Sequence, residues 1–315
     1  MAYVIGLDVG GTKIEGVLAR AAYHGSIPKV VRKVRLQTHP SSREKTIGNI
    51  VDAVAWLYSY GKENVNGFRL GGIGIGTSGF LRNGRMEMVP NIPALKGVQL
   101  RNVLQEQLRE KGINSSLHVE NDSICFVLAE SMWGAARGFK SAIGVIVGTG
   151  IGGGLVLDGR VYRGRNGGAG HIGHVTIDPA GPRCGCGQFG HFESWCSGKH
   201  IVMRYIAAGG KMRGTGPAAI FAAAEAGRDA VAGRVMVETY EKFGIAIAGL
   251  INTFNPEVIV LGGGVSNLPP AFYKRIAAAA GKYAYPALFR GVKIIRNRLG
   301  DDAGVLGAAS LALNG

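Results

Sequence analysis

The chain has 315 residues, 46% of them hydrophobic, and carries 36 lysine and arginine residues against 21 acidic ones, a formal net charge of +15. This length and composition allow a sizeable buried core and argue against global disorder. No apolar run reaches the roughly 18 residues of a membrane span, and the N-terminal residues lack the features of a signal peptide. Four cysteines, two of them in a C-x-C pair, do not make a disulfide framework, so we expect a cytoplasmic protein without a membrane partner.

The basic charge allows more than one interpretation. Such a surface attracts polyanions, but the sequence contains no zinc-finger ligand series, no aromatic RNA-binding motif and no basic recognition helix. We therefore expect general surface basicity and no specific nucleic-acid partner. An anionic small substrate, or polyphosphate as a phosphoryl donor, is compatible with the same charge.

The first half of the chain alternates predicted strands and helices. Residues 3–9 and 14–19 predict two strands joined by the glycine turn 10–13. The elements that follow are an amphipathic helix at 47–61, a buried strand at 71–80, a helix at 98–111, a strand at 117–122 that ends on polar residues, and a helix at 123–136.

The second half begins with another strand, glycine turn and strand between residues 141 and 164, with Asp158 and Gly159 as a hairpin turn. The remaining predicted elements are an alanine-rich helical region at 217–251, a buried strand running into a glycine turn at 256–266, a strand at 292–297 and a final helix from residue 300 onward. The mixture of strands and helices predicts an α/β protein.

A short internal repeat links the two halves. Aligning Gly6 with Gly144, an offset of 138 residues, superposes IGLDVGGTKIEGVL on IGVIVGTGIGGGLV. This suggests two related domains that face each other across a cleft. Asp8 in the first copy corresponds to Ile146 in the second, and a carboxylate in an apolar strand is costly without a partner. We therefore expect Asp8 to hold hydrated Mg²⁺.

Three glycine turns follow predicted strands. The G-x-G-x-x-G pattern at 148–153 would indicate a dinucleotide site only if it opened a helix, and here it opens a predicted hairpin. Glycine turns between strands can still bind phosphate through convergent backbone N–H groups. Ordinary tight turns are the alternative. The predicted ATP contacts are Asp8, Gly10, Gly11, Thr12, Lys13, Thr149, Gly150, Gly262, Gly263 and Gly264.

The motifs together resemble the ROK family of sugar kinases, within the actin-like ATPase superfamily. They are DVGGTK (8–13), GIGTSG (74–79), PNIPALKG (90–97), ENDSICFVLAE (120–130), GTGIGGG (148–154), GGAGHIGH (167–174), CGCGQFGHFE (184–193) and NPEVIVLGGGVS (255–266). The resemblance implies a two-lobed α/β actin-like (ribonuclease H-like) fold with duplicated βββαβα domains around a central cleft. We expect a small lobe at 1–122, joined by a C-terminal helix at about 301–315, and a large lobe at 123–300 with a zinc-binding loop.

The resemblance also implies ATP-dependent phosphorylation of a hexose, with glucose at its 6-hydroxyl as our first choice. The alternatives are an N-acetylhexosamine kinase, acting on N-acetylmannosamine or N-acetylglucosamine, and a non-catalytic sugar-binding regulator. Asp122 aligns with the family's catalytic base, although the N-cap of the helix that begins at Ser123 is its other plausible role. The sugar contacts implied by the resemblance are Asn91, Asn121, Asp122, His171, His174 and Glu193.

The stretch CGCGQFGHFE predicts a structural zinc site. The family commonly binds zinc with a histidine and three cysteines; here His174, Cys184 and Cys186 match, and His191 replaces the third cysteine. Cys196 is the alternative fourth ligand, and a metal-free loop is the remaining alternative. The resemblance assigns His174 to the sugar as well, so we interpret the metal as a scaffold for sugar recognition.

Two positions depart from the family pattern. His171 stands where many family glucokinases have glutamate, in a context similar to that of bacterial N-acetylmannosamine kinases. A carboxylate accepts two hydroxyl hydrogen bonds, whereas a neutral imidazole accepts one and donates one, so the sugar preference stays open. Ser78 replaces a proline often found in this turn, a change that we expect to matter little. The resemblance further suggests a homodimer.

Overall fold

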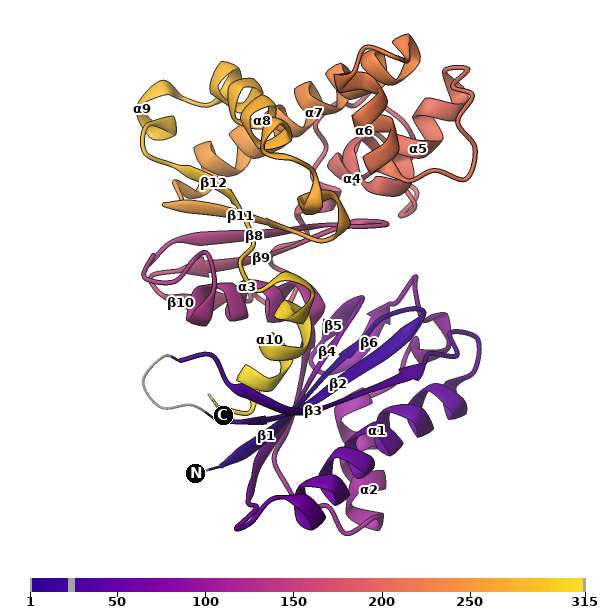
Figure 1. Cartoon of the computed structure of the whole chain (residues 1–315), viewed down its shortest axis with the longest axis vertical. Helices are drawn as coiled ribbons and strands as arrows, with labels where there is room; N and C mark the ends of the chain where they lie inside the picture. Colours follow the sequence, from indigo (N-terminus) through magenta and orange to yellow (C-terminus); the bar gives the residue numbers. More distant parts are fainter. Residues whose placement is uncertain (1, 22–25, 314–315) are drawn as a thin grey trace. The chain divides into compact units, whose positions relative to one another are not determined.

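A computed structural model describes residues 2–21 and 26–313. The chain divides into two compact units, and Figure 1 shows the elements of each. Unit 1 comprises Met1–Arg137, Val161–Ala169 and Leu299–Gly315, and unit 2 comprises Gly138–Arg160 and Gly170–Arg298. In the part of the chain that the structure describes, no helix has both the length and the apolar character to cross a membrane.

Unit 1 contains a five-stranded mixed sheet in the spatial order β3-β2-β1-β4-β7. Its strands are β1 (Tyr3–Val9), β2 (Lys13–Arg20), β3 (Lys29–Gln37), β4 (Leu70–Thr77) and β7 (Leu117–Asn121). The first three are antiparallel neighbours, whereas β4 runs parallel to β1 and β7 runs parallel to β4. The carboxyl ends of β1, β4 and β7 therefore meet at one edge of the sheet.

Helices cover both faces of this sheet (Figure 1). α1 (Arg43–Asn64) and α2 (Leu100–Glu110) share one hydrophobic core with the strands. α3 (Asp122–Trp133) and α10 (Ala303–Leu311) lie on the other face, where a Cβ at Gly6 would approach Ala309 N to 2.6 Å and one at Gly74 would collide with the Ala308 carbonyl oxygen. The smaller elements are β5 (Phe80–Arg82), β6 (Arg85–Met88), η1 (Pro93–Leu95) and η4 (Gly300–Asp302).

The sheet of unit 2 repeats the topology of unit 1. Its order is β10-β9-β8-β11-β12, with strands β8 (Ala142–Val147), β9 (Ile151–Leu157), β10 (Arg160–Tyr162), β11 (Val258–Gly262) and β12 (Lys293–Arg296). β9 is antiparallel to β8, whereas β11 is parallel to both β8 and β12. Gly6 and Gly144 lie inside the equivalent strands β1 and β8, so the internal repeat found in the sequence is confirmed as a structural one.

The helices of unit 2 pack around an aromatic core. The Phe243 ring meets Phe192 and Phe272 edge-on, with centroids 4.9 and 5.9 Å away. The elements are η2 (Ile172–His174), α4 (Phe192–Cys196), α5 (Gly198–Ala207), α6 (Pro217–Glu225), α7 (Ala230–Phe254), η3 (Gly264–Asn267), α8 (Pro270–Tyr283) and α9 (Pro286–Phe289).

The predicted α/β class is confirmed, and the differences have local causes. The helical region predicted at 217–251 forms two helices, because Gly227 takes a positive φ of 64° after α6 and the Asp229 side chain caps α7 by accepting a hydrogen bond from Ala232 N at 2.9 Å. The hairpin turn at Asp158 and Gly159 is confirmed by their positive φ angles of 51° and 73°. The prediction missed β3, α5 and α8.

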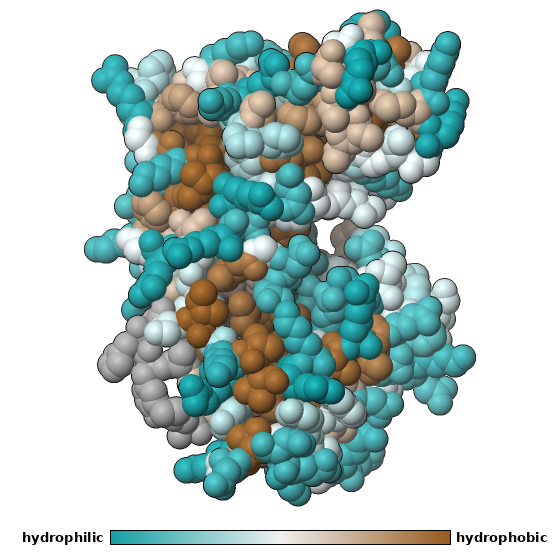
Figure 2. Space-filling view, in the orientation of Figure 1, coloured by the Kyte–Doolittle hydropathy of each residue, from teal (hydrophilic) through white to brown (hydrophobic). Residues whose placement is uncertain are grey.

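The surface shows no single concentration of hydrophilic side chains on the face drawn in Figure 2; they are spread over both units. Several basic side chains already have partners. Lys33 pairs with Asp302 at 2.6 Å, and the Arg32 guanidinium lies 5.3 and 5.1 Å from the ring centroids of Trp56 and Tyr60.

Candidate functional site

The glycine turn after β1 is held in place by β3. Gly10 N donates a hydrogen bond to the Lys13 carbonyl oxygen at 3.0 Å, which closes the turn. Thr38, directly after β3 and only 2% exposed, donates from its backbone N to Thr12 O at 3.1 Å and from Oγ1 to Gly10 O at 2.7 Å. No pattern in the sequence indicated Thr38, because its partners are 26 to 28 positions away and become neighbours only when β3 pairs with β2.

Gly11 lies against the loop that carries Asn91. A Cβ at Gly11 would be 2.8 Å from the Asn91 carbonyl oxygen and 2.9 Å from its Cβ, so a side chain at position 11 would displace this loop. Asn91 itself is exposed and precedes η1. The structure therefore brings the turn and Asn91, both predicted as ligand contacts, next to each other within unit 1.

Asp122 is the first residue of α3, at the carboxyl edge of the unit 1 sheet. The N-cap is Asn121, whose Oδ1 accepts a hydrogen bond from Ser123 N at 2.9 Å and whose Nδ2 donates to Gly79 O at 2.9 Å. The alternative interpretation of Asp122 as the N-cap is therefore wrong. Asp122 Oδ1 accepts from Ser123 N at 2.8 Å, and burial raises the pKa of Asp122 above its usual range despite this bond.

Asp8 is a second carboxylate with an unfavourable environment. It lies in β1 opposite Glu15, and a Cβ at Gly304, near the start of α10, would be 2.5 Å from its Oδ2. Burial, followed by the negative charges of Asp122 and Glu15, raises the pKa of Asp8 to about 7, and Lys13 opposes this only in part. Oxygen ligands with excess negative charge suit Mg²⁺, so the residues present fit a hydrated magnesium ion at this edge.

The two glycine turns of unit 2 share one edge of its sheet. Gly148 N donates to Gly150 O at 2.9 Å, and Gly198 N, at the start of α5, donates to Gly148 O at 2.8 Å. β11 runs parallel to β8, and Gly263, with a φ of 80°, approaches Val147 so closely that a Cβ would be 2.6 Å from its carbonyl oxygen. The predicted phosphate contacts at this edge are Thr149, Gly150, Gly262, Gly263 and Gly264.

Glu193 connects the first of these turns to the cysteine loop. Its Oε2 accepts a hydrogen bond from Ile151 N at 2.9 Å, and a Cβ at Gly150 would lie 2.5 Å from the same oxygen. Its Oε1 accepts from Cys184 Sγ at 3.6 Å. One carboxylate therefore touches both the turn after β8 and the cluster described next, a link that the sequence alone did not predict.

Two histidines and two cysteines form a potential metal site. Their donor atoms all lie within 4.8 Å of one another, in the cluster His174, Cys184, Cys186 and His191. His174 Nδ1 is 3.7 Å from Cys184 Sγ, and His191 Nδ1 is 3.3 Å from Cys186 Sγ. In a tetrahedral zinc site, Zn–N and Zn–S bonds of about 2.0 and 2.3 Å hold the donors roughly 3.3 to 3.8 Å apart. Both the donor types and the spacing fit zinc.

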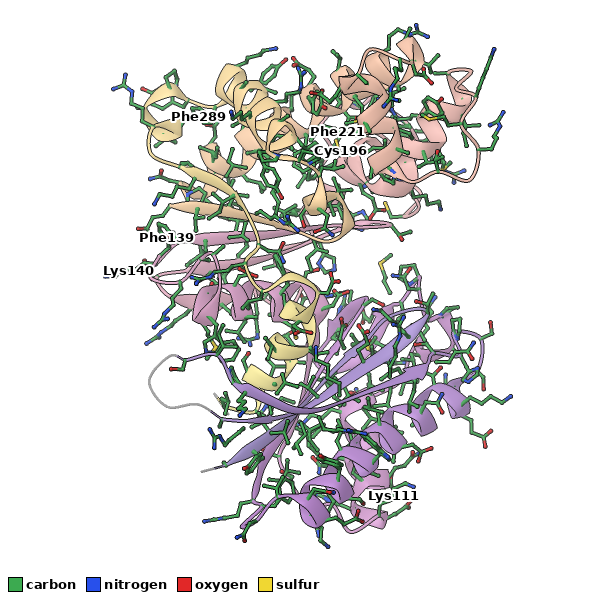
Figure 3. All side chains as sticks on the ribbon, in the orientation of Figure 1. Lys111, Phe139, Lys140, Cys196, Phe221 and Phe289 are labelled. Carbon is green, nitrogen blue, oxygen red and sulfur yellow. The ribbon has the colours of Figure 1, made fainter. Side chains whose placement is uncertain are left out.

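Cys196, the alternative fourth ligand, lies elsewhere. Its Sγ donates to the Thr239 carbonyl oxygen at 3.6 Å, and burial raises the pKa of its thiol. Figure 3 labels it among the helices of unit 2. Within the described residues, the structure brings His191 and not Cys196 to the cluster.

His171 lies beside this cluster, directly before η2. Its ring centroid is 6.4 Å from that of His174. Burial, and then the charge of His174, lowers the pKa of His171, which favours a neutral ring near pH 7 that can both accept and donate a hydrogen bond.

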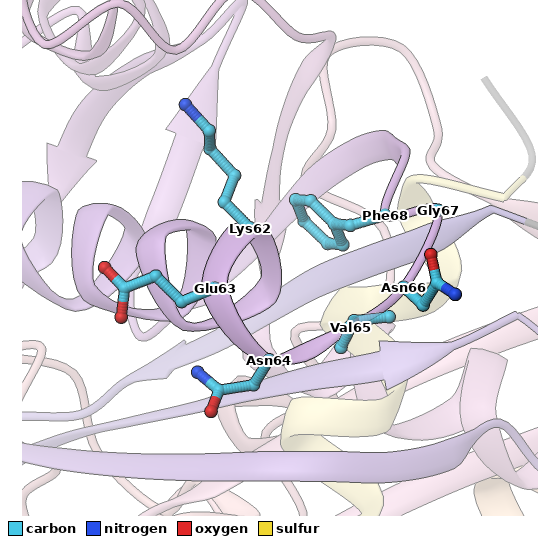
Figure 4. A pocket seen from close by; sticks show the side chains of 7 residues that line it. All are labelled: Lys62, Glu63, Asn64, Val65, Asn66, Gly67 and Phe68. Atoms are coloured by element: carbon cyan, nitrogen blue, oxygen red, sulfur yellow. The ribbon is translucent and has the colours of Figure 1, made fainter.

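A separate hollow lies at the end of α1 and is lined by residues 62–68 (Figure 4). These residues precede the amino end of β4, whereas Ser78 and Gly79 follow its carboxyl end. The hollow is thus at the opposite edge of the sheet from Asp8 and Asp122, and it is not part of the candidate site.

The model of the ROK family matches residues 4–314. The chain belongs to the ROK family. It is 30% identical to the glucokinase of Thermotoga maritima, over 98% of this chain and 96% of that one, and 31% identical to the N-acetyl-D-glucosamine kinase of Pectobacterium atrosepticum, over 98% of each. A crystal structure of a ROK family glucokinase from Streptomyces griseus, in complex with glucose and AMPPNP, matches with a TM-score of 0.80 and 27% identity over 100% of both chains. The predicted family and its actin-like α/β fold are confirmed.

Proposed function

We propose that this ROK family chain transfers the terminal phosphoryl group of ATP to a hydroxyl of a hexose, with the 6-hydroxyl of glucose as the first candidate. The chain is similar to sugar kinases over its full length, which supports ATP and a hexose as its two substrates. The observation that carries the proposal is the placement of Asp122. Asn121 is the N-cap of α3, so Asp122 is not needed as the cap, although its Oδ1 accepts hydrogen bonds from Ser123 N and Oγ.

Asp122 acts as the general base. The sugar oxygen attacks the terminal phosphorus, its hydrogen passes to an Asp122 carboxylate oxygen, and ADP leaves with the electrons of the broken P–O bond. A raised pKa makes Asp122 a stronger proton acceptor than an exposed aspartate. Asp8 would hold the water ligands of Mg²⁺. When bound, this ion would supply positive charge to offset the negative charge of the phosphates.

The backbone of the glycine turns binds the phosphates of ATP. In unit 1 this role belongs to residues 10–13, and in unit 2 to Thr149, Gly150 and the turn 262–264. Glycine turns between strands can bind an anion through backbone N–H groups, and the Thr38 hydrogen bonds and the Gly198 hydrogen bond hold the first two turns in place.

The sugar contacts are Asn91, Asn121, Asp122, His171, His174 and Glu193, as the family resemblance implies. His174 directs Nδ1 toward Cys184, which leaves its Nε2 for a sugar hydroxyl. Zinc held by His174, Cys184, Cys186 and His191 would keep this tautomer fixed. The hydrogen bond from Ile151 N orients the Glu193 carboxylate in the same way.

A second candidate function is phosphorylation of an N-acetylhexosamine, either N-acetylmannosamine or N-acetylglucosamine. The specific observation in its favour is His171, which replaces a carboxylate by a neutral ring. The identity of the chain to a glucokinase and to an N-acetyl-D-glucosamine kinase is nearly equal, 30% and 31%.

A sugar panel separates these candidates. We would measure ADP formation with ATP, Mg²⁺ and each of glucose, mannose, N-acetylglucosamine and N-acetylmannosamine, and compare kcat/KM. We expect glucose to have the highest value; an equal or higher value for an N-acetylated sugar would favour the second function. Calorimetric sugar binding without ADP formation would indicate a non-catalytic regulator instead.

Asp122→Asn tests the chemistry in the same assay. We expect kcat to fall by roughly 10²- to 10⁴-fold, without a fall in the unfolding temperature. The matched control is Asp302→Asn, which removes an exposed carboxylate paired with Lys33 and should leave kcat unchanged. The homodimer, the cytoplasmic location and the use of polyphosphate stay predictions.

A further inference from the structure

Ser78 presents a buried hydroxyl group at the carboxyl edge of the unit 1 sheet. It is 7% exposed, and its Oγ has no hydrogen-bond partner among the described residues. Leaving a buried hydroxyl unsatisfied costs about 1–3 kcal/mol, so such a group in a folded protein needs an explanation. Ser78 directly follows β4, the strand between β1 with Asp8 and β7 with Asn121.

The turn at Ser78 is fixed from both sides. Ser78 N donates a hydrogen bond to Val9 O at 3.3 Å, which ties it to the residue before the Gly10 turn. Gly79 O accepts from the Asn121 side chain at 2.9 Å, which ties it to the residue before Asp122. Ser78 is therefore held between the proposed phosphate turn and the proposed base.

The pleat of β4 shows which way the Ser78 side chain points. A Cβ at Gly76 would lie 3.1 Å from Cys125 Sγ, so position 76 faces α3, and Gly76 is in register with Asp8. Ser78 is the first residue after β4, and its bond to Val9 O continues the hydrogen-bond ladder between β1 and β4. Side chains alternate along a strand, so continued alternation would direct the Ser78 side chain to the same face as position 76. Asp122 lies about one helical turn before Cys125 on α3, and so on the same side of the helix. The Ser78 hydroxyl is thus directed toward the first turn of α3.

We propose that the Ser78 hydroxyl donates a hydrogen bond to an oxygen of the phosphoryl group during its transfer to the sugar. This inference rests on the proposed function. Asp8 and Asp122 place two carboxylates at this edge, and they repel an anionic phosphoryl group. A neutral donor next to the partial positive charge at the N-terminus of α3 offsets part of that repulsion. This inference departs from the expectation that serine in place of proline matters little, because proline has no side-chain donor.

Ser78→Ala tests this proposal, and Ser131→Ala is the matched control. The Ser131 hydroxyl is also buried without a partner among the described residues, but it lies nine positions after Asp122 in α3. We would measure kcat, the KM for sugar and for ATP, and the unfolding temperature of each variant.

We expect Ser78→Ala to lower kcat by about tenfold to a hundredfold, equally for every sugar that the wild type accepts. KM values should change less than threefold, and Ser131→Ala should behave as the wild type does. If the wild type phosphorylates a sugar and Ser78→Ala has the same kcat, the inference about Ser78 is overturned, while the proposed function stands. A raised KM for one sugar with unchanged kcat assigns the hydroxyl to the sugar and also overturns it. A wild-type chain that phosphorylates no sugar overturns the proposed function itself.

Discussion

Asp122 and Asp8 show how burial prepares single side chains for chemistry. Both are carboxylates at or near the end of a parallel strand, and burial is the largest cause of the raised pKa of each. For Asp122 a raised pKa is useful, because it increases basicity. For Asp8 it reflects a charge that the protein alone does not compensate, which is the condition that a bound cation relieves.

The pH dependence of activity follows from Asp122. The base is active only when deprotonated, so kcat/KM falls as the pH falls through its pKa. Because burial raises that pKa, the loss should have its midpoint above the value of about 3.9 that an exposed aspartate has. Initial rates between pH 4 and pH 9 would show this when measured at saturating Mg²⁺, because a bound cation keeps Asp8 ionised below its pKa of about 7. Circular dichroism would confirm the fold at each pH. Full activity retained down to pH 4 would contradict the assignment.

Asp8→Asn should stabilise the ligand-free protein at pH 8 while it weakens Mg²⁺-dependent activity. A carboxyl whose pKa is about 7 when folded and 3.8 when unfolded binds more protons in the folded state. At pH 8 its charge therefore destabilises the fold, by up to about 4 kcal/mol for a shift of three units. This destabilisation decreases as the pH falls toward 5.

Denaturant melts of the wild type and Asp8→Asn at pH 8 and pH 5, without Mg²⁺ or nucleotide, would measure the difference. We expect a clear gain in the free energy of unfolding at pH 8 and a smaller one at pH 5. Equal stability of the two proteins at both pH values would mean that the Asp8 charge is compensated within the protein.

Among the structural elements, the loop between η2 and α4 carries the potential metal site. It contains little regular structure. The four cluster residues lie at its two ends, His174 in η2 and His191 directly before α4, and within it, at Cys184 and Cys186. Four donors at zinc-site spacing can hold such a loop where hydrophobic burial cannot. The adjacent Glu193 then depends on the same loop for its position.

Cys186→Ser and Cys196→Ala test which cysteine binds the metal. We expect Cys186→Ser to lose zinc, measured as metal per chain by mass spectrometry, and to raise the KM for sugar more than the KM for ATP. Cys196→Ala should keep one zinc per chain, because its thiol bonds to Thr239 O in the helical core. Loss of zinc in Cys196→Ala with retention in Cys186→Ser would reverse the assignment.

For the whole molecule, the C-terminal helix completes the fold of the first unit. α10 belongs to unit 1 although nearly the entire second unit separates it from β4 in the sequence. Its contacts with the sheet use glycines at positions 6 and 74, where backbone approaches backbone. The domain that begins the chain is therefore complete only when the last helix has been added.

Gly74→Ala tests this closure, with Gly48→Ala as its control. The Cβ at position 74 would collide with the Ala308 carbonyl oxygen, so we expect a loss of about 3 kcal/mol in unfolding free energy. A Cβ at Gly48, inside α1, meets nothing within 4 Å, and alanine there should add about 1 kcal/mol. Denaturant melts give both values. Equal effects of the two substitutions would show that α10 does not pack against β4 as described.

The sequence by itself determined the family, the α/β class, the repeated strand–turn–strand unit and the residue types of the candidate site. These depend on local patterns: apolar runs, glycine turns and short motifs that stay together along the chain. Asp122, the glycine turns and the cluster of histidines and cysteines could all be named in this way.

Only the tertiary structure decided that Asn121 caps α3 in place of Asp122, that His191 and not Cys196 joins the cluster, and that Thr38 and Ser78 lie beside the proposed phosphate turn. The physical reason is the same in each case. These relations are hydrogen bonds and close approaches between segments far apart in sequence, or a choice between neighbouring side chains, and strand register and helix packing select among them. A periodic pattern states which face a residue takes, but not which partner it meets there.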